Sequence, residues 1–583
     1  MSSSAPRMVN SYGNMISGFS ARLTREELEA MVTKEGFLHA NPDRILPLQT
    51  THTPEFLGLH LQDGFVKGSN FGGGVIISML DTSVFPNHPS FSDDAMSSPS
   101  AMWKGHCDFG ASLCNNKLIG GRTFVNGNVG KSPPVDEEGH DTHTTSTAAE
   151  QFVKGEEMLG EALGTTLGMA PRTHLAIYKV CNDEGCVESD ILAAMDAAVD
   201  DGVDVLLLSI GGVSIPFYAD DIAIGAFGDI EKEVFVSCAT GNAGPFSKML
   251  SNEAPWILTV AASTMDRSIR AFVKLDNGVV LNGELLYQQK DFPSIPLPLV
   301  YAESSSNPDA ALCDDGSLDG LNVKGKVVVC ERDDFSGRID KGKTVKDAAA
   351  MILMNQAVDR FCTLVDPHVL PASHIGYTDG TALTAYIGSS GNATTTFAFQ
   401  GMVLGTGSAS AVSSFSSCEL SGASPGILKP DISGPGVSIL AAWPPTVDSS
   451  SAMTGHSATF NMVSDTSMST SHLSRIAALL RAVHPDWSPA AIKSAIMTTP
   501  DTLDCSSNPI TDENHLPATY FALGSGHVNP TKAVDPGLVY NLTSDDYFPY
   551  LCGLGYTSKQ VQAITRMSGS CDTVGRIPQW DLN

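Results

Sequence analysis

Buried strands and helices alternate along the first half of the chain, and this alternation is the feature that most limits its fold. One helical segment begins at Glu188 and stops at Gly202, and another runs from Asp221 to about Glu233. The expected strands around them are Val75–Leu80, Leu175–Cys181, Val203–Ser209, Val234–Cys238 and Ile257–Ala262. Repeated β-α-β units require right-handed crossovers and a parallel sheet that is covered on both faces. The sequence therefore predicts an α/β fold.

The carboxyl ends of the predicted strands are where an open parallel sheet places its chemistry, and Asp81 directly follows the first of them. Far along the chain, the stretch Phe460–His472 contains Ser467 and leads into an apolar helix that ends near Leu480. A serine hydroxyl is a weak nucleophile unless a base takes its proton and donors stabilise the resulting oxyanion. Ser467 is therefore a candidate nucleophile that needs partners elsewhere in the chain.

The composition excludes several classes of partner. The 583 residues carry a formal net charge of −29, with 42% hydrophobic and 17% charged residues. Nucleic acid and anionic membrane surfaces attract lysine and arginine, so neither is an expected partner. No apolar run reaches the roughly 18 residues of a membrane span. The first ten residues lack the apolar core of a signal peptide.

The N-terminal part has the pattern of a small α+β unit. Residues 8–23 predict two short strands around Gly18, and the capping box Thr24–Glu27 starts a helix that ends at about Thr33. Between residues 46 and 56 the composition becomes that of a linker that a protease could cut.

An insert interrupts the α/β alternation. From about residue 298 to residue 400 the chain is rich in Gly, Asp and Ser and contains strands such as Lys326–Cys330. The first unit resumes at Pro430–Gly436, and a further helix is predicted from Ala490 to Met497. The insert is therefore expected to be a separate small domain.

Cysteine spacing favours disulfide bonds. Twelve cysteines include two close and two wider pairs, without the double Cys-x-x-Cys rhythm of zinc sites. The candidate pairs are Cys107 with Cys114, Cys181 with Cys186, Cys313 with Cys330, and Cys552 with Cys571. Asn392 and Asn541 lie in Asn-x-Thr sequons and are candidate glycosylation sites. These features belong to an oxidising compartment, so we expect secretion although the chain as given carries no signal peptide.

Three segments supply partners for the candidate nucleophile. They are Met79–Ser83 around Asp81, Gly139–Thr144 around His140, and Ser464–Met468 around Ser467. The chain order Asp, His, Ser is that of subtilisin and differs from the orders of chymotrypsin and the α/β-hydrolases. With these motifs the chain resembles the subtilisin-like serine proteases, and in detail the cucumisin-like plant subtilases. Further matching blocks extend over nearly the whole chain, at residues 11–21, 56–59, 88–91, 116–120, 484–497, 527–530 and 550–556.

The resemblance implies a subtilisin-like parallel-sheet sandwich and a role for each motif. Asp81 would orient His140, His140 would act as general base and then acid, and Ser467 would attack the peptide carbonyl to form an acyl-enzyme. Asn242 matches the family's oxyanion asparagine, whose amide contributes roughly 3–4 kcal/mol in such enzymes. The substrate-binding edge segment, which would pair with an extended polypeptide, matches Ser209, Ile210, Gly211 and Gly212.

The resemblance also divides the chain into parts. Residues 1–49 resemble an inhibitory α+β propeptide without its first part, which would be removed near Gln49–Thr50 from a peptidase domain of residues 50–583. Residues 297–400 resemble the mostly-β protease-associated domain that the family inserts there. The family's C-terminal fibronectin type III-like domain is missing, so we expect a chain truncated at both ends. The implied enzyme is an extracellular endopeptidase of the cell wall or apoplast, made as a zymogen and without a metal or cofactor.

Several residues beside the triad depart from the family pattern. Ser83, Asp141 and Asp465 stand where the family has glycine, as does Arg475 inside the following helix. Where glycine has positive φ or permits close approach, a side chain costs on the order of 1–3 kcal/mol. Asp465 would repel the forming oxyanion, and Asp141 would stabilise protonated His140. Arg475 must reach solvent or find a carboxylate. A second hypothesis is therefore a catalytically impaired subtilase that acts as a peptide- or protein-binding scaffold.

Each of these residues taken alone also has a simpler interpretation. Asp81 could cap a turn, Ser467 could be a helix N-cap, and Asn242 after Gly241 is a common turn residue. A metal site at His140 and His143 is disfavoured, because the spacing is not His-x-x-x-His and no carboxylate ligand is evident.

Overall fold

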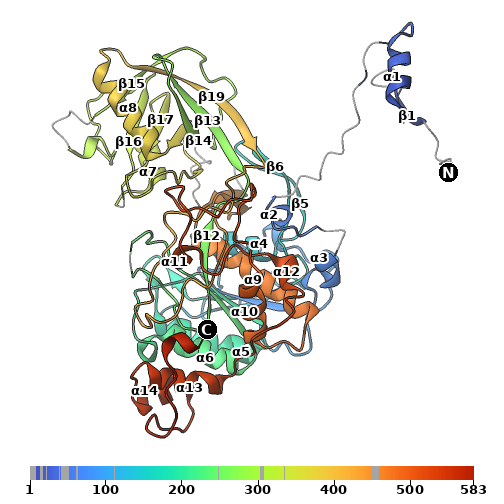
Figure 1. Cartoon of the computed structure of the whole chain (residues 1–583), viewed down its shortest axis with the longest axis vertical. Coiled ribbons are helices and arrows are strands. Elements are labelled where there is room, and N and C mark those ends of the chain that lie inside the picture. Colours follow the sequence, from blue (N-terminus) through green and yellow to red (C-terminus); the bar gives the residue numbers. More distant parts are fainter. Residues whose placement is uncertain are drawn as a thin grey trace. The chain divides into compact units, whose positions relative to one another are not determined.

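The chain forms two compact units, residues 1–49 and residues 50–583 (Figure 1). The computed structural model describes residues 8–12, 18–21, 23–37, 40, 52–60, 64–110, 112–246, 248–302, 308–333, 335–447 and 459–582. Across these ranges, no helix combines the length and the apolar character that crossing a bilayer requires. The predicted cleavage position at Gln49–Thr50 lies outside the described residues.

The first unit contains a short hairpin and a helix. Strands β1 (Met8–Tyr12) and β2 (Gly18–Ala21) pair antiparallel, and α1 (Arg25–Val32) follows. The capping box at the start of α1 is present, since the Thr24 hydroxyl accepts from the Glu27 amide and the Glu27 carboxylate accepts from the Thr24 amide. The two strands and the helix predicted for this region are confirmed.

A parallel sheet of seven strands forms the core of the second unit. Its order is β20-β12-β11-β10-β3-β7-β4, and every neighbouring pair runs parallel. The strands are β3 (Ile76–Asp81), β4 (Leu118–Thr123), β7 (His174–Lys179), β10 (Val205–Leu208), β11 (Phe235–Ala239), β12 (Leu258–Ser263) and β20 (Ile432–Pro435). The five predicted strands are confirmed to within two residues. The other two, β4 and β20, contain glycine and lack the continuous apolar run that marks a buried strand.

Helices cover both faces of this sheet, because successive strand residues point to opposite sides. On one face, Leu206 and Leu208 pack in a core that includes α5 (Glu188–Asp201) and α6 (Asp221–Glu231). On the other face, Val205 and Leu207 pack with α4 (His140–Ala149), α9 (Thr466–Val483) and α10 (Pro489–Thr498). Near-continuous apolar strands are what a doubly covered sheet requires.

A closed barrel is inserted in the chain between β12 and β20 of the parallel sheet. It contains β13 (Ser268–Leu275), β14 (Val280–Glu284), β15 (Leu297–Tyr301), β16 (Val327–Glu331), β17 (Ala350–Met354), β18 (Ala372–Ile375) and β19 (Thr394–Val403). Helices α7 (Arg338–Thr344) and α8 (Tyr377–Ser389) lie within it in sequence. The barrel takes in β13 and β14 and so starts earlier than residue 297. The reason is that β13 pairs with the distant β19, a partner that local composition does not reveal.

Short elements complete the second unit. They are the hairpin β5 (Val153–Met158) and β6 (Glu161–Thr166), β8 (Cys181–Asn182) and β9 (Gly185–Cys186), β21 (Ile439–Ala442) and β22 (Phe460–Val463), and helices α2 (Thr53–Phe56), α3 (Gly64–Gly68), α11 (Tyr520–Leu523), α12 (Pro530–Ala533), α13 (Ser544–Gly553) and α14 (Ser558–Thr565). Disulfides join Cys107 to Cys114, Cys181 to Cys186, Cys313 to Cys330, and Cys552 to Cys571.

Helix α9 carries an arginine in the middle of the core. Arg475 is 1% exposed, and its Nε and Nη2 have no hydrogen-bond partner among the described residues. Burial lowers the pKa of Arg475 well below its usual value, against the opposite effect of Glu150. Burial likewise raises the pKa of Glu150 to about 8. The side chain therefore neither reaches solvent nor forms the ion pair that its position calls for.

Replacing Arg475 by methionine should stabilise the protein. The unbranched apolar side chain fills similar space without a buried, incompletely paired charge, so we expect the free energy of unfolding to rise by about 1–3 kcal/mol. Arg481→Met, on the same helix, is the control. Arg481 donates a hydrogen bond to the Trp487 carbonyl, so the Arg481→Met variant should be less stable than the wild type. Urea denaturation of both variants measures the difference, and a less stable Arg475→Met variant contradicts this account.

Candidate active site

A cleft of about 470 Å³ opens at the carboxyl end of the parallel sheet. The ends of β3, β10 and β11 and the start of α4 and α9 all contribute to it. Its lining includes Asp81, His140, Ser209, Ile210, Gly211, Asn242 and Ser467. Residues that are far apart in sequence therefore share one cavity, at the edge where parallel sheets place their chemistry.

Asp81 and His140 form a hydrogen-bonded pair in this cleft. Asp81 ends β3 and is 2% exposed, while His140 is the first residue of α4. The Nδ1 atom of His140 lies 3.0 Å and 2.9 Å from the two carboxylate oxygens of Asp81. The Thr82 amide donates to the same carboxylate at 2.7 Å. The contact places the Nδ1 proton between the residues and leaves Nε2 for chemistry.

The carboxylates around His140 favour its protonated form. Burial alone lowers the pKa of His140, but the charge and hydrogen bond of Asp81, with smaller effects of Asp465 and Asp141, raise it to about 10. An imidazole must be neutral to accept a proton from a serine. In this resting arrangement His140 is therefore charged at neutral pH.

Ser467 and Asn242 both contact Asp465. Ser467 is the second residue of α9 and is 3% exposed, and its backbone N–H donates to Asp465 Oδ1 at 2.8 Å. The Nδ2 atom of Asn242 donates to Asp465 Oδ2 at 2.7 Å. The Oδ1 atom of Asn242 accepts from the amide and hydroxyl of Thr466, at 3.0 and 2.9 Å. No hydrogen bond joins Ser467 to His140 in the part of the chain that is described.

The segment Ser209–Gly212 follows β10 in an irregular conformation. Asn252 donates to the carbonyl of Ile210 at 2.8 Å, and the Ser251 hydroxyl donates to that of Gly212 at 2.6 Å. A Cβ at Gly211 would lie only 2.7 Å from the Ser251 side chain, so this position requires glycine. The first three residues of the segment line the cleft, and Gly212 lies beyond its lining.

Comparison with known proteins identifies the family. Residues 72–526 match the subtilase family. Subtilisin-like protease SBT1.5 of Arabidopsis thaliana is 43% identical over 99% of this chain and 78% of its own length. The chain belongs to the subtilase family. It is thus a subtilisin-like serine endopeptidase, similar in sequence to those of plants.

Two further sequence matches agree with this assignment. Subtilisin-like protease SBT3 of Solanum lycopersicum is 40% identical to this subtilase over 100% of the chain and 77% of its own length. Residues 2–49 match the peptidase inhibitor I9 family, which marks the first unit as a propeptide of a zymogen. The solved structure of the subtilisin-like protease Apa1 from an Antarctic Pseudoalteromonas covers 81% of this chain and 95% of its own, at 17% identity and a TM-score of 0.38.

Asp136 is a positioning residue that the sequence interpretation missed. This carboxylate is 1% exposed and accepts from the amides of Glu138 and Gly139, the hydroxyl of Thr82, and both the amide and hydroxyl of Thr142. It therefore joins the residue after Asp81 to the first turn of the His140 helix. Its place four residues before His140 is the one signal that could have drawn attention to it.

The predicted strain at the three replaced glycines occurs at one of them. Ser83 has a φ of 90°, in the region that disfavours a Cβ. Asp465 has an extended backbone with φ −165° and ψ 157°, and Asp141 lies within helix α4, so neither position is strained. The expectation of backbone strain is therefore wrong for Asp141 and Asp465.

Asp141 is held by its own surroundings. Its carboxylate is fully buried and accepts from the Ser83 amide at 3.0 Å and from the hydroxyls of Thr145 and Thr144 at 2.7 and 3.2 Å. Burial and the charge of Asp81 raise the pKa of Asp141 well above its usual value. The charge of Asp141 contributes to the raised pKa of His140, after the larger effects of Asp81 and Asp465, in accord with the predicted stabilisation of the imidazolium.

His143 is a buried structural residue of helix α4. Its Nε2 lies 3.0 Å from the carbonyl oxygen of Ile439 and 3.2 Å from that of Asn461. The other ring nitrogen, Nδ1, is buried and has no hydrogen-bond partner among the described residues.

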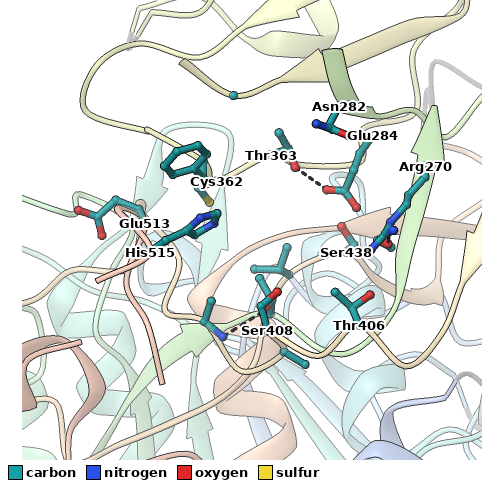
Figure 2. Close-up of a pocket in the computed structure, with 18 of the residues that line it drawn as sticks. Arg270, Asn282, Glu284, Cys362, Thr363, Thr406, Ser408, Ser438, Glu513 and His515 are labelled. Atoms are coloured by element: carbon teal, nitrogen blue, oxygen red, sulfur yellow. Dashed lines mark hydrogen bonds between the residues drawn. The ribbon is translucent and has the colours of Figure 1, made fainter. Parts of the chain in front are cut away.

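A second and larger cavity, of about 540 Å³, lies away from the cleft, between the barrel and the rest of the second unit. Figure 2 shows Arg270 and Glu284 from the barrel facing Glu513 and His515 across the cavity. The Thr363 hydroxyl donates a hydrogen bond to the Glu284 carboxylate. None of the triad residues lines it, and its lining mixes both signs of charge.

The strain at Ser83 can be isolated with two substitutions. Both Ser83→Gly and Ser83→Ala remove the hydroxyl that donates to the Pro134 carbonyl, but only glycine removes the Cβ. We expect the glycine variant to be more stable than the alanine variant by about 1 kcal/mol. Urea denaturation measures the difference, and equal stability of the two variants contradicts strain at φ 90°.

The protonation state of His140 can be read by NMR. With histidine labelled at the Cε1 carbon and the His140 signal assigned by its loss in His140→Gln, we expect it to remain protonated at pH 8, because the pKa is raised to about 10. Asp141→Asn should shift this titration only a little, since Asp141 has the smallest effect among the three carboxylates that raise the His140 pKa. A midpoint near the ordinary value of about 6.5 contradicts the expectation.

Proposed function

We propose that this subtilase hydrolyses peptide bonds through Asp81, His140 and Ser467. The hydrogen-bonded pair of Asp81 and His140 in the same cleft as Ser467 carries the proposal. His140 takes the proton of the Ser467 hydroxyl as Oγ attacks the substrate carbonyl, and then returns it to the leaving amine. Asp81 holds the ring in the required tautomer and stabilises the imidazolium. Water hydrolyses the acyl-enzyme by the same route in reverse.

The oxyanion of the tetrahedral intermediate would be held by two N–H groups. One is the backbone N–H of Ser467, and the other is the Nδ2 group of Asn242. Thr466 supports this role, because its amide and hydroxyl bind Asn242 Oδ1 and so aim Nδ2 toward the start of α9. Removing one such donor in related chemistry costs a factor of about 10²–10³ in rate.

An extended polypeptide would bind along residues 209–212. The first three of these residues line the cleft beside the triad, and the segment is not part of a strand, so a substrate backbone can be added there by strand pairing. The propeptide, residues 1–49, would act as an inhibitor until cleavage near Gln49–Thr50. The barrel, with the predicted insert 297–400 inside it, would be the protease-associated domain.

We also propose that the protein is secreted to the cell wall or apoplast. Four disulfides are stable in an oxidising compartment, and the sequon residues Asn392 and Asn541 are both exposed. Glycosylation at these two asparagines is part of the proposal.

A second candidate function is a catalytically impaired scaffold that binds peptides or a protein partner. The observation that favours it is the state of the cleft itself. His140 is charged at neutral pH, and Asp465 holds both groups that the oxyanion needs. A peptide could still bind along the edge segment without being cut.

A fluorophosphonate probe separates the two functions. On the purified, processed protein we expect covalent labelling that disappears in Ser467→Ala, because only the activated serine reacts with such probes. Ser469→Ala is the matched control. Ser469 lies two residues after Ser467 on α9, and its hydroxyl donates a hydrogen bond to the Ala261 carbonyl, so labelling should persist in this variant. Labelling that survives in Ser467→Ala contradicts the assigned nucleophile, and an unlabelled but folded wild type favours the scaffold.

A further inference from the structure

Asp465 lies at the start of helix α9 with both carboxylate oxygens engaged. Oδ1 accepts from the Ser467 amide at 2.8 Å, and Oδ2 accepts from Asn242 Nδ2 at 2.7 Å. The two donors are 225 positions apart in sequence, by subtraction of their residue numbers, and meet only in the folded cleft. Hydrogen bonds to a charged acceptor are stronger than neutral ones, so this is a firmly held group.

Helix capping explains only one of these two bonds. The comparable N-cap of α6 is Asp220, whose carboxylate accepts from backbone N–H groups of its own helix, those of Ala223 and Ile222. At Asp465 the bond from Ser467 is a capping bond of the same kind. The bond from the Asn242 side chain has no part in capping, and it comes from the residue that the proposed mechanism needs at this place.

We propose that the Asp465 carboxylate is the resident ligand of the oxyanion hole and that a substrate carbonyl must displace it. The inference rests on the proposed function, because that function makes Ser467 N–H and Asn242 Nδ2 the oxyanion donors. The Asp465 carboxylate now accepts from both of these N–H groups. Its negative charge, shared by two oxygens, stands where the negative oxygen of the tetrahedral intermediate would form.

The side chain has a way to leave. Its backbone is extended, with φ −165° and ψ 157°, and departure by rotation about its own side-chain bonds is the part of the proposal that would free both donors. The Thr466 bonds to Asn242 Oδ1 do not involve Asp465 and would keep the amide aimed into the hole. Both oxyanion donors are therefore in place and oriented, but the Asp465 carboxylate occupies them.

The substitutions Asp465→Asn and Asp465→Gly test the proposal. Asparagine keeps an oxygen to cap Ser467 N–H but removes the charge, and its amide nitrogen cannot accept from Asn242. Glycine empties the hole. Asp220→Asn is the matched control, since it removes the same charge from an N-cap outside the cleft.

The readout is the second-order rate of fluorophosphonate labelling of the processed enzyme. Ser467 Oγ forms a bond to phosphorus, fluoride leaves, the serine proton goes to the neutral fraction of His140, and the phosphoryl oxygen enters the oxyanion hole. We expect both Asp465 variants to be labelled faster than the wild type by on the order of 100-fold or more, from the usual effect of one oxyanion donor. Asp220→Asn should be labelled at the wild-type rate.

The outcomes are distinct. Faster labelling in both Asp465 variants with an unchanged Asp220→Asn supports the inference when the gain exceeds the increase in neutral His140, measured by the same histidine NMR, because the Asp465 charge also raises the His140 pKa. A gain that the change in His140 protonation fully accounts for overturns the inference. Equal labelling of the wild type and the Asp465 variants overturns the inference and leaves the proposed triad standing. No labelling of any folded variant overturns both. Circular dichroism and urea denaturation confirm that each variant is folded, and asparagine retains the cap if glycine does not.

Discussion

The hydrogen-bonded ladder that holds β3 between β7 and β10 determines where everything else in the cleft can lie. Parallel pairing aligns the ends of these strands, so Asp81 at the end of β3 and Ser209 after β10 come to the same edge. The ladder continues through β11, which brings the loop with Asn242 to that edge as well. Helices α4 and α9 pack on one face with their N-termini at the cleft, and His140 and Ser467 lie in their first turns.

Negative charge is the second organising feature of the cleft. Three carboxylates surround His140, and each is accommodated differently. Asp81 pairs with the imidazole, burial raises the pKa of Asp141 among its hydroxyl donors, and Asp465 accepts hydrogen bonds from two N–H donors. A single histidine that faces this arrangement is a stronger base than usual, which is why it holds its proton. The same charges that complete the structure of the resting cleft therefore oppose its chemistry.

Helix α9 shows a related cost in the core. Arg475 enters a region shared with Glu150 and Lys117, all three fully or almost fully buried. Lys117 is satisfied by the carbonyls of Pro171 and Thr173, but two nitrogens of Arg475 have no partner in the described part of the chain. A fold with a large parallel sheet and four disulfides can tolerate such a defect, because many other contacts hold the helix.

The sequence by itself determined the α/β class, five of the seven central strands, the capping box of the first unit and the family, because these depend on local periodicity and on motifs. It also placed the four cysteine pairs, whose members are close in sequence. Only the tertiary structure decided what the replaced residues do. The backbone at Asp465 is extended, and its carboxylate meets an amide from a distant loop, which no local pattern encodes. The role of Asp136 and the early start of the barrel likewise depend on long-range pairing. The conformation of a residue and its hydrogen-bond partners depend on the neighbours that folding brings to it. Those neighbours cannot be read from the order of residues alone.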